Sequence, residues 1–235
     1  MAKKNNSHPQ NRLLQLLPAK DLARLKPDLE YVELEYKFII AKPRGAMSDV
    51  YFVESGVVSL MAFMKTGLSL EVATIGREGT TGVPIFLGSG TIPLQIMVQI
   101  PGSGFRMSVE AFRDETSQPG PLHDIVARYT QALMVQIAQG NACNNVHNIQ
   151  QRAARWLLTT RDRVDSDTYP LTQEFLAQML GVRRAGVNEV AASFRKQRMI
   201  DYDKGSVTIL NRAALERIVC ECYGIVRDEH ERLLD

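Results

Sequence analysis

The chain has 235 residues, a hydrophobic fraction of 45% and a formal net charge of +2. This length accommodates two modest domains, and no apolar run approaches the roughly 20 residues that a membrane-spanning helix needs. The N-terminal stretch Met1 to Gln10 is polar, which argues against a secretory signal, and three cysteines without framework spacing fit a reducing compartment. We therefore expect a cytoplasmic protein with no membrane partner.

The first part of the chain, residues 1–118, is predicted to be a β domain. Ten of the 16 glycines fall between Gly45 and Gly104, where they punctuate short stretches with strand patterning. In the clearest predicted strand, Val32 to Ile40, apolar residues alternate with charged ones, so that one side should be buried. Further strands are predicted over residues 50–53, 57–63, 70–75, 96–100 and 105–109. Several short antiparallel strands with tight turns predict a roll or barrel.

A long helix is predicted to begin near Pro121, a residue that suits the first turn of a helix. A stripe with spacings of three and four follows, and it is long enough to pair with a second copy of the chain. We therefore expect residues 119–148 to form a dimerisation helix and hinge. A single helix lying on its own β domain would show the same stripe. The predicted dimer-interface residues are Val126, Tyr129, Leu133, Ile137 and Gly140.

Residues 173–190 fit the pattern of a helix-turn-helix. Thr172 can cap the first helix with its hydroxyl, and Leu176 and Leu180 lie four apart on one face. Gly181 falls where the chain must turn sharply, at a position where a left-handed conformation costs glycine nothing. An inward face on the second helix is predicted from Val182, Val187 and Val190. An ordinary helical hairpin with a charged solvent face would fit this stretch equally well.

The residues that follow favour a DNA-binding wing. Two short strands are predicted at 199–202 and 207–210, around the turn Asp203-Lys204-Gly205-Ser206. Between Arg183 and Arg198 five basic residues stand against one acid, a local net charge of +4 that would lie along a phosphate backbone. The residues predicted to contact DNA are Thr172, Arg183, Arg184, Ala185, Asn188, Glu189, Arg195, Lys196 and Lys204.

A last helix is predicted from Arg212 onward, capped by Asn211 and packed on a winged domain that spans residues 149–235. Cys220 and Cys222 would lie two apart on this helix, so their side chains should diverge, and we expect no metal site. His123 and His147 on the long helix are expected to be surface or interface residues rather than haem ligands. Catalytic residues are not predicted, because the chain has no nucleophile elbow, phosphate-cradling loop or ligand-spaced His/Cys/carboxylate set.

The order of these parts resembles the Crp/Fnr family of transcription regulators. The blocks that carry the resemblance are residues 151–158 (Q-R-A-A-R-W-L-L), residues 171–177 (L-T-Q-E-F-L-A) and residues 180–182 (L-G-V). The stretch from Tyr51 to Gly82 is similar to that family's cyclic-nucleotide-binding-like roll, with Gly45 and Gly56 matching glycines of the roll. The resemblance implies an α+β protein made of an N-terminal antiparallel β-roll, a long dimerisation helix and a C-terminal winged helix-turn-helix. It also places Arg184 where the family's guanine-reading arginine lies.

The chain departs from the pattern of the nucleotide-binding members of that family. Those members hold the ribose with an acidic Gly-Glu-Leu loop and the phosphate with an Arg-Ser or Arg-Ala pair. Here the corresponding stretches read Gly-Val-Pro-Ile-Phe-Leu at 82–87 and Thr-Ile-Pro-Leu at 91–94, without an acid or an arginine. The adenine-reading polar pair of some members corresponds to Ile137 and Ala138. Cyclic AMP is therefore not expected as the effector.

Iron–sulfur and haem cofactors are not expected either. Members of the family with an iron–sulfur cluster carry cysteines near the N-terminus, and this chain has none before Cys143. The expected function is that of a homodimeric regulator that binds a two-fold symmetric, double-stranded DNA operator, with RNA polymerase as a possible further partner. The alternative is a sensory roll that responds to another small ligand or to a protein partner, with DNA binding secondary.

Overall fold

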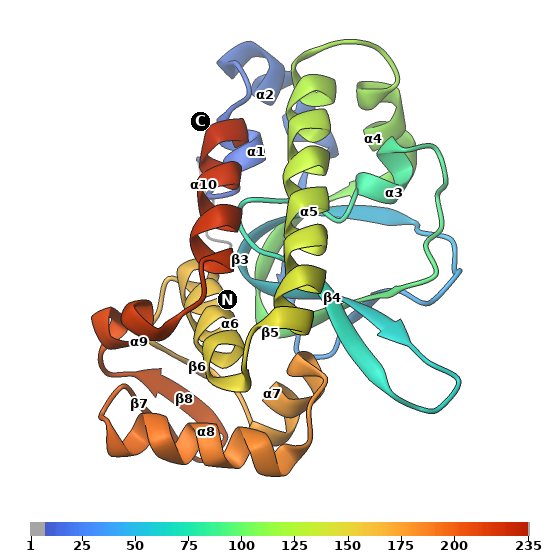
Figure 1. Ribbon diagram of the computed structural model, residues 1–235. Coiled ribbons are helices and arrows are strands. Elements are labelled where there is room, and N and C mark those ends of the chain that lie inside the picture. Colours follow the sequence, from blue (N-terminus) through green and yellow to red (C-terminus); the bar gives the residue numbers. More distant parts are fainter. Residues whose placement is uncertain (1–7, 235) are drawn as a thin grey trace.

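The computed structural model describes residues 8–234, and Figure 1 shows a β-roll beside a long helix, with smaller helices and a short sheet below them. Most of the polar N-terminal stretch discussed above lies outside the described residues. The elements of the first part are α1 (Arg12–Gln15), α2 (Ala19–Leu25), the 3-10 helix η1 (Lys26–Asp28), β1 (Glu30–Leu34), β2 (Ile39–Ala41), β3 (Asp49–Phe63), β4 (Ser69–Ile75), α3 (Val83–Phe86), β5 (Gln95–Ser108) and α4 (Val109–Thr116).

The roll is one antiparallel sheet in the order β1-β5-β3-β4, with β2 also paired to β5. Its framework is the pair β3 and β5, of 15 and 14 residues, where the sequence predicted four shorter strands. Gly56 explains the difference, because at φ +84° it lies in a register shift of β3 against β5 rather than in a turn. Such bulges bend a strand without ending it, which lets the sheet curl into a roll.

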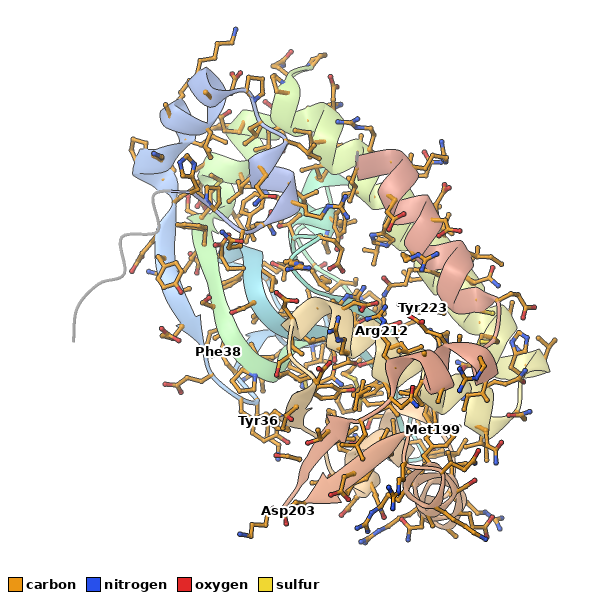
Figure 2. The ribbon with its side chains drawn as sticks, turned by 90° about the vertical axis from the view of Figure 1, so that its left-hand side faces the viewer. Tyr36, Phe38, Met199, Asp203, Arg212 and Tyr223 are labelled. Atoms are coloured by element: carbon orange, nitrogen blue, oxygen red, sulfur yellow. The ribbon has the colours of Figure 1, made fainter. Side chains whose placement is uncertain are left out.

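The prediction of a single strand from Val32 to Ile40 is wrong. The chain turns between β1 and β2, and Lys37 adopts a left-handed conformation with φ +64°. Tyr36 and Phe38, which were expected to be buried, are 51% and 43% exposed, and Figure 2 shows both at the edge of the roll. The alternation of apolar and charged residues runs on through this turn. The turn contains neither glycine nor proline, so the sequence gives no sign of it.

The central helix α5 (Pro121–Val146) begins with Pro121 as predicted. Val126, Tyr129 and Leu133 are buried in the same core as the strands of the roll, Ile137 packs against that core, and Gly140 is half-buried. The predicted dimer stripe therefore packs on the protein's own roll, and the assignment of Val126, Tyr129 and Leu133 to a dimer interface is corrected. An apolar stripe indicates that a helix face is buried, but it does not identify what buries it.

The C-terminal part has a second core, in which a three-stranded sheet packs with a group of helices, and Val57, Met61 and Ile100 of the roll join this core. The sheet order is β6-β8-β7, and the sequence predicted only its last two strands. Across residues 8–234 no helix combines the length and hydrophobicity that crossing a membrane requires. The elements are α6 (Ile149–Val164), β6 (Thr168–Pro170), α7 (Gln173–Leu180), α8 (Arg184–Lys196), β7 (Ile200–Asp203), β8 (Ser206–Ile209), α9 (Arg212–Ile218) and α10 (Cys222–Leu234).

The predicted last helix is two helices. Asn211 caps α9 as expected, by accepting a hydrogen bond from the Ala214 amide at 2.9 Å. The chain then breaks at residues 219–221, and α10 runs beside α5, as Figure 1 shows. Leu233 and Leu234 at its end join the core of the roll. Tyr223 near the start of α10 still belongs to the core of the winged part, so the expectation that the whole segment packs there is wrong only for the rest of α10.

Candidate DNA-binding interface

Helix α7 is the first helix of the helix-turn-helix, and it is capped as predicted. The Thr172 hydroxyl accepts a hydrogen bond from the Phe175 amide at 3.1 Å. Leu176 and Leu180 are buried together on its inner face. Gly181 ends the helix at φ +63°, a conformation that costs a residue with a Cβ atom additional energy. The sharp turn brings the next helix across the first.

Helix α8 follows with an apolar inner face and a polar outer face. Val187, Val190 and Phe194 are buried against the winged part, while Val182 before the helix is partly buried. Figure 1 shows α8 along the lower edge of the molecule, where other elements do not cover its outer side. Every residue predicted to contact DNA is exposed, namely Thr172, Arg183, Arg184, Ala185, Asn188, Glu189, Arg195, Lys196 and Lys204.

The wing is a tight hairpin beside α8. Lys204 and Gly205 have φ of +44° and +83°, so the two-residue turn has the positive φ values typical of hairpins that match strand twist. Figure 2 shows Asp203 at the tip of this hairpin. The Arg195 Nε donates to Asp201 Oδ1 at 3.0 Å and so joins the end of α8 to β7. Helix α8 and the wing therefore form one continuous exposed surface.

The arginine that the resemblance assigns to base reading is only loosely held. Arg184 Nη1 lies 3.9 Å from Glu174 Oε2, and the two side chains are 66% and 79% exposed. An exposed pair at this distance contributes about 0–1 kcal/mol, so little is lost when Arg184 turns toward another acceptor. Glu174 itself belongs to the first turn of α7 and not to α8.

The winged part is fastened to the roll by buried polar contacts that the sequence did not predict. Arg163 of α6 pairs with Glu78 at 2.7 Å and also donates to Gln136 Oε1 of α5 at 2.9 Å. Burial is the largest single influence on the pKa of Glu78 and would raise it, but the charges of Arg163 and His230 and the backbone hydrogen bonds together lower this pKa overall. These partners are 27 to 85 residues apart in sequence, and no local pattern indicates such pairings.

The roll contains a partly open apolar cavity of about 170 Å³ against α5. It lies beside Val83, Pro84 and Leu94, from the stretches in which the acid and the arginine of nucleotide-binding members were found to be missing. Its lining, entirely within the described residues, includes no charged side chain. A cyclic phosphate placed here would have no cationic partner from these lining residues.

The expectation that Cys220 and Cys222 diverge on one helix is wrong, because Cys220 precedes α10 and Cys222 begins it. Both thiols converge with Cys143 and His147 from the end of α5. Helical periodicity does not apply to this pair, because Cys220 lies in the break between α9 and α10 and Cys222 lies after it. The local signal was the pair Cys143-x-x-x-His147, whose two side chains share one face of a helical turn.

Comparison with known proteins agrees with this architecture. A sequence model described as "Crp-like helix-turn-helix domain" matches residues 151–218, whereas no curated protein matches the sequence. Among solved structures, FixK2 from Bradyrhizobium japonicum matches with a TM-score of 0.68 and 15% identity, covering 82% of this chain and 98% of that one.

Two further solved structures match equally broadly. TTHA1359, a Crp/Fnr-family transcriptional regulator from Thermus thermophilus, has a TM-score of 0.66 and 17% identity over 80% of this chain and 97% of that one. The c-di-GMP-responsive global regulator CLP of Xanthomonas campestris has a TM-score of 0.65 and 14% identity over 82% and 99%. The chain thus has the fold of the Crp/Fnr transcriptional regulators and carries their type of helix-turn-helix domain at residues 151–218.

Proposed function

We propose that this protein is a sequence-specific DNA-binding transcription regulator of Crp/Fnr type. The observation that carries the proposal is the exposed face of α8, which presents Arg183, Arg184 and Asn188 beside a wing with Lys204 in its turn. Side chains of these types read base edges in the major groove, while Arg195, Lys196 and Lys204 have the charge to hold phosphates. Affinity for DNA is the property that separates this function from that of a module contacting only proteins.

The test is the dependence of DNA affinity on salt. Each phosphate neutralised by Lys or Arg releases counterions, so log K should fall linearly with log salt, with a slope near −0.9 per contact. Fluorescence anisotropy with a labelled duplex at several salt concentrations should give a steep negative slope for the wild type. The variant Lys196→Ala should lower the slope by about one contact, and Lys20→Ala on α2 is the matched control that should not. A weak or salt-independent interaction would favour the protein-contact alternative.

We further infer a homodimer that binds two half-sites, with the exposed side of α5 as the pairing face. Residues at spacings of four, three, four and four on this side are small or apolar apart from one glutamine, and they would let two helices approach closely. Met134 in their middle is 66% exposed, which is unusual for a large apolar side chain at a helix centre. These residues are Ala127, Gln131, Met134, Ala138 and Ala142.

The effector of the roll, where one is bound, is proposed to be an uncharged apolar molecule rather than a cyclic nucleotide. The uncharged lining of the cavity beside Val83 and Leu94 supports this. Calorimetry with cyclic AMP and cyclic GMP should give no heat of binding, and operator affinity should not change when either is added. A micromolar dissociation constant for either nucleotide would overturn this assignment.

A further inference from the structure

Four side chains with metal-binding atoms meet where α5 ends and α10 begins. Cys143 lies in the last turn of α5, His147 follows the helix directly, and Cys220 and Cys222 flank the start of α10. All four ligand atoms lie within 4.8 Å of one another. The three cysteines are buried and form a separate small cluster apart from the two large cores. They are also all the cysteines of the chain.

The distances within this cluster correspond to the edges of a tetrahedron around one metal ion. Cys143 Sγ lies 3.6 Å from Cys220 Sγ, and Cys222 Sγ lies 3.5 Å from His147 Nδ1. Ligand bonds of about 2.3 Å to sulfur and about 2.1 Å to nitrogen give tetrahedral edges of about 3.8 Å and about 3.6 Å. The thiols are too far apart for a disulfide, which needs about 2.05 Å. The space also fits a single ion rather than a cluster of several irons.

The orientation of His147 supports a ligand role. Its Nδ1 faces Cys222, and its Nε2 lies 3.2 Å from Glu221 Oε2. Histidines that bind metals commonly donate their other ring N–H to a carboxylate, which fixes the tautomer and the ring orientation. Glu221 belongs to the same short link as the two cysteines, so one segment of chain supplies two thiols and the carboxylate that orients the histidine.

The surroundings also suit the charge of such a site. Three thiolates and one neutral imidazole around a divalent cation carry a net charge of −1. Arg152 is only 8% exposed and interacts electrostatically with Cys143 and Cys220. Its Nη2 donates to the Leu180 carbonyl, while its Nε has no hydrogen-bond partner within residues 8–234. An anionic metal centre would give this buried guanidinium a compensating charge.

We propose that Cys143, His147, Cys220 and Cys222 form a Cys3His site for one structural Zn²⁺. Sulfur and imidazole ligands in a closed tetrahedron select zinc among the common divalent ions. The ion fastens α10 to the end of α5, next to Asn148, where the chain passes into α6. Zinc occupancy therefore stabilises the junction between the long helix and the winged part. This site is independent of the DNA-binding face.

The first experiment measures zinc in the full-length protein, expressed with added zinc and purified without chelator. Elemental analysis should find one zinc per chain. His147→Ala should reduce the content to below about a tenth, because a site that loses one of four ligands binds much more weakly. His123→Ala is the matched control, since His123 is on the same helix and contacts the Thr116 carbonyl instead. The control should keep its zinc.

A second measurement uses the unaltered chain and so does not depend on the folding of variants. Protein stripped by a chelator under reducing conditions should melt at a lower temperature, and one equivalent of Zn²⁺ should restore the wild-type transition. Co²⁺ added instead should give the intense visible absorption of tetrahedral thiolate coordination. Thiol reagent should react with three cysteines in the stripped protein and with none promptly in the zinc form.

Two results would overturn the proposal. One is folded wild-type protein that contains no stoichiometric zinc and takes up none on titration. The other is a Cys143–Cys220 disulfide in protein kept under reducing conditions, detected by mass spectrometry as the loss of two hydrogens. Neither result bears on DNA binding, so the zinc site and the regulator function are tested independently.

Discussion

The indole Nε1 of Trp156 donates a hydrogen bond of 2.9 Å to Glu71 Oε1 and so joins α6 of the winged part to β4 of the roll. Ser59 donates to the other carboxylate oxygen at 2.8 Å. Burial raises the pKa of Glu71 to about 7 despite these two donors. A group at the junction between the two parts therefore titrates near neutral pH.

The raised pKa of Glu71 predicts a loss of stability as pH rises. The folded state holds the proton up to about pH 7, whereas the unfolded chain releases it near its ordinary pKa of 4.5. Between these values the folded state binds more protons, so the free energy of unfolding falls with increasing pH and levels off above pH 7. Because Glu71 is partly exposed, we expect a total effect on the order of 1–2 kcal/mol.

Urea unfolding of the wild type and of Glu71→Gln at pH 5 and pH 8 measures this effect. Glutamine keeps an oxygen for Trp156 and does not titrate, so the variant should lose less stability than the wild type between the two pH values. Equal losses would show that Glu71 does not titrate in this range.

The buried pair Arg163–Glu78 predicts an asymmetric cost of mutation. Arg163→Ala leaves a buried carboxylate and Gln136 without their partner, and should lower the free energy of unfolding by about 3–5 kcal/mol. Arg161 on the same helix pairs with Asp167 at the surface, so Arg161→Ala should cost less than about 1 kcal/mol. Similar costs for the two variants, measured by urea unfolding, would contradict the assignment of Arg163 as the buried tie between roll and winged part.

Two neighbouring residues of α5 distinguish core from pairing face. Leu133 is 5% exposed within the roll core, whereas the next residue, Met134, is 66% exposed. Leu133→Glu should therefore unfold the roll, whereas Met134→Glu should keep the fold and dissociate the dimer by placing like charges across a two-fold axis. Sedimentation and circular dichroism on both variants test this, and a folded, intact dimer in Met134→Glu would move the interface elsewhere.

Arg184 and Lys196 predict different effects on DNA binding. A bidentate arginine–guanine contact contributes about 1–3 kcal/mol of discrimination, so Arg184→Ala should weaken operator binding far more than binding to random DNA. Lys196→Ala should weaken both by a similar factor, because phosphate contacts carry no sequence information. Competition binding measures the ratio directly. An equal loss on both DNAs for Arg184→Ala would remove Arg184 from base reading.

The sequence predicted the features that local chemistry determines. The Thr172 cap, Gly181 and the Lys204-Gly205 turn have short-range signatures, and the structure confirms each of them. The errors concern relationships between distant segments. The stripe with Tyr129 and Leu133 was correctly predicted to be buried, but its partner is the roll of the same chain. The cysteine–histidine cluster brings together residues 77 positions apart across a helix break, which periodicity along a single helix cannot reveal.

Selection of bound sequences from a random DNA pool examines base reading and the pairing of two chains in one measurement. A dimeric regulator should enrich an inverted repeat whose half-sites lie about one helical turn, roughly 10–10.5 base pairs, apart from centre to centre. Arg184→Ala should relax one position in each half-site, and Met134→Glu should abolish the enrichment. A pool that stays random with the folded wild-type protein, or one that yields a single asymmetric site, would contradict the proposed dimeric regulator.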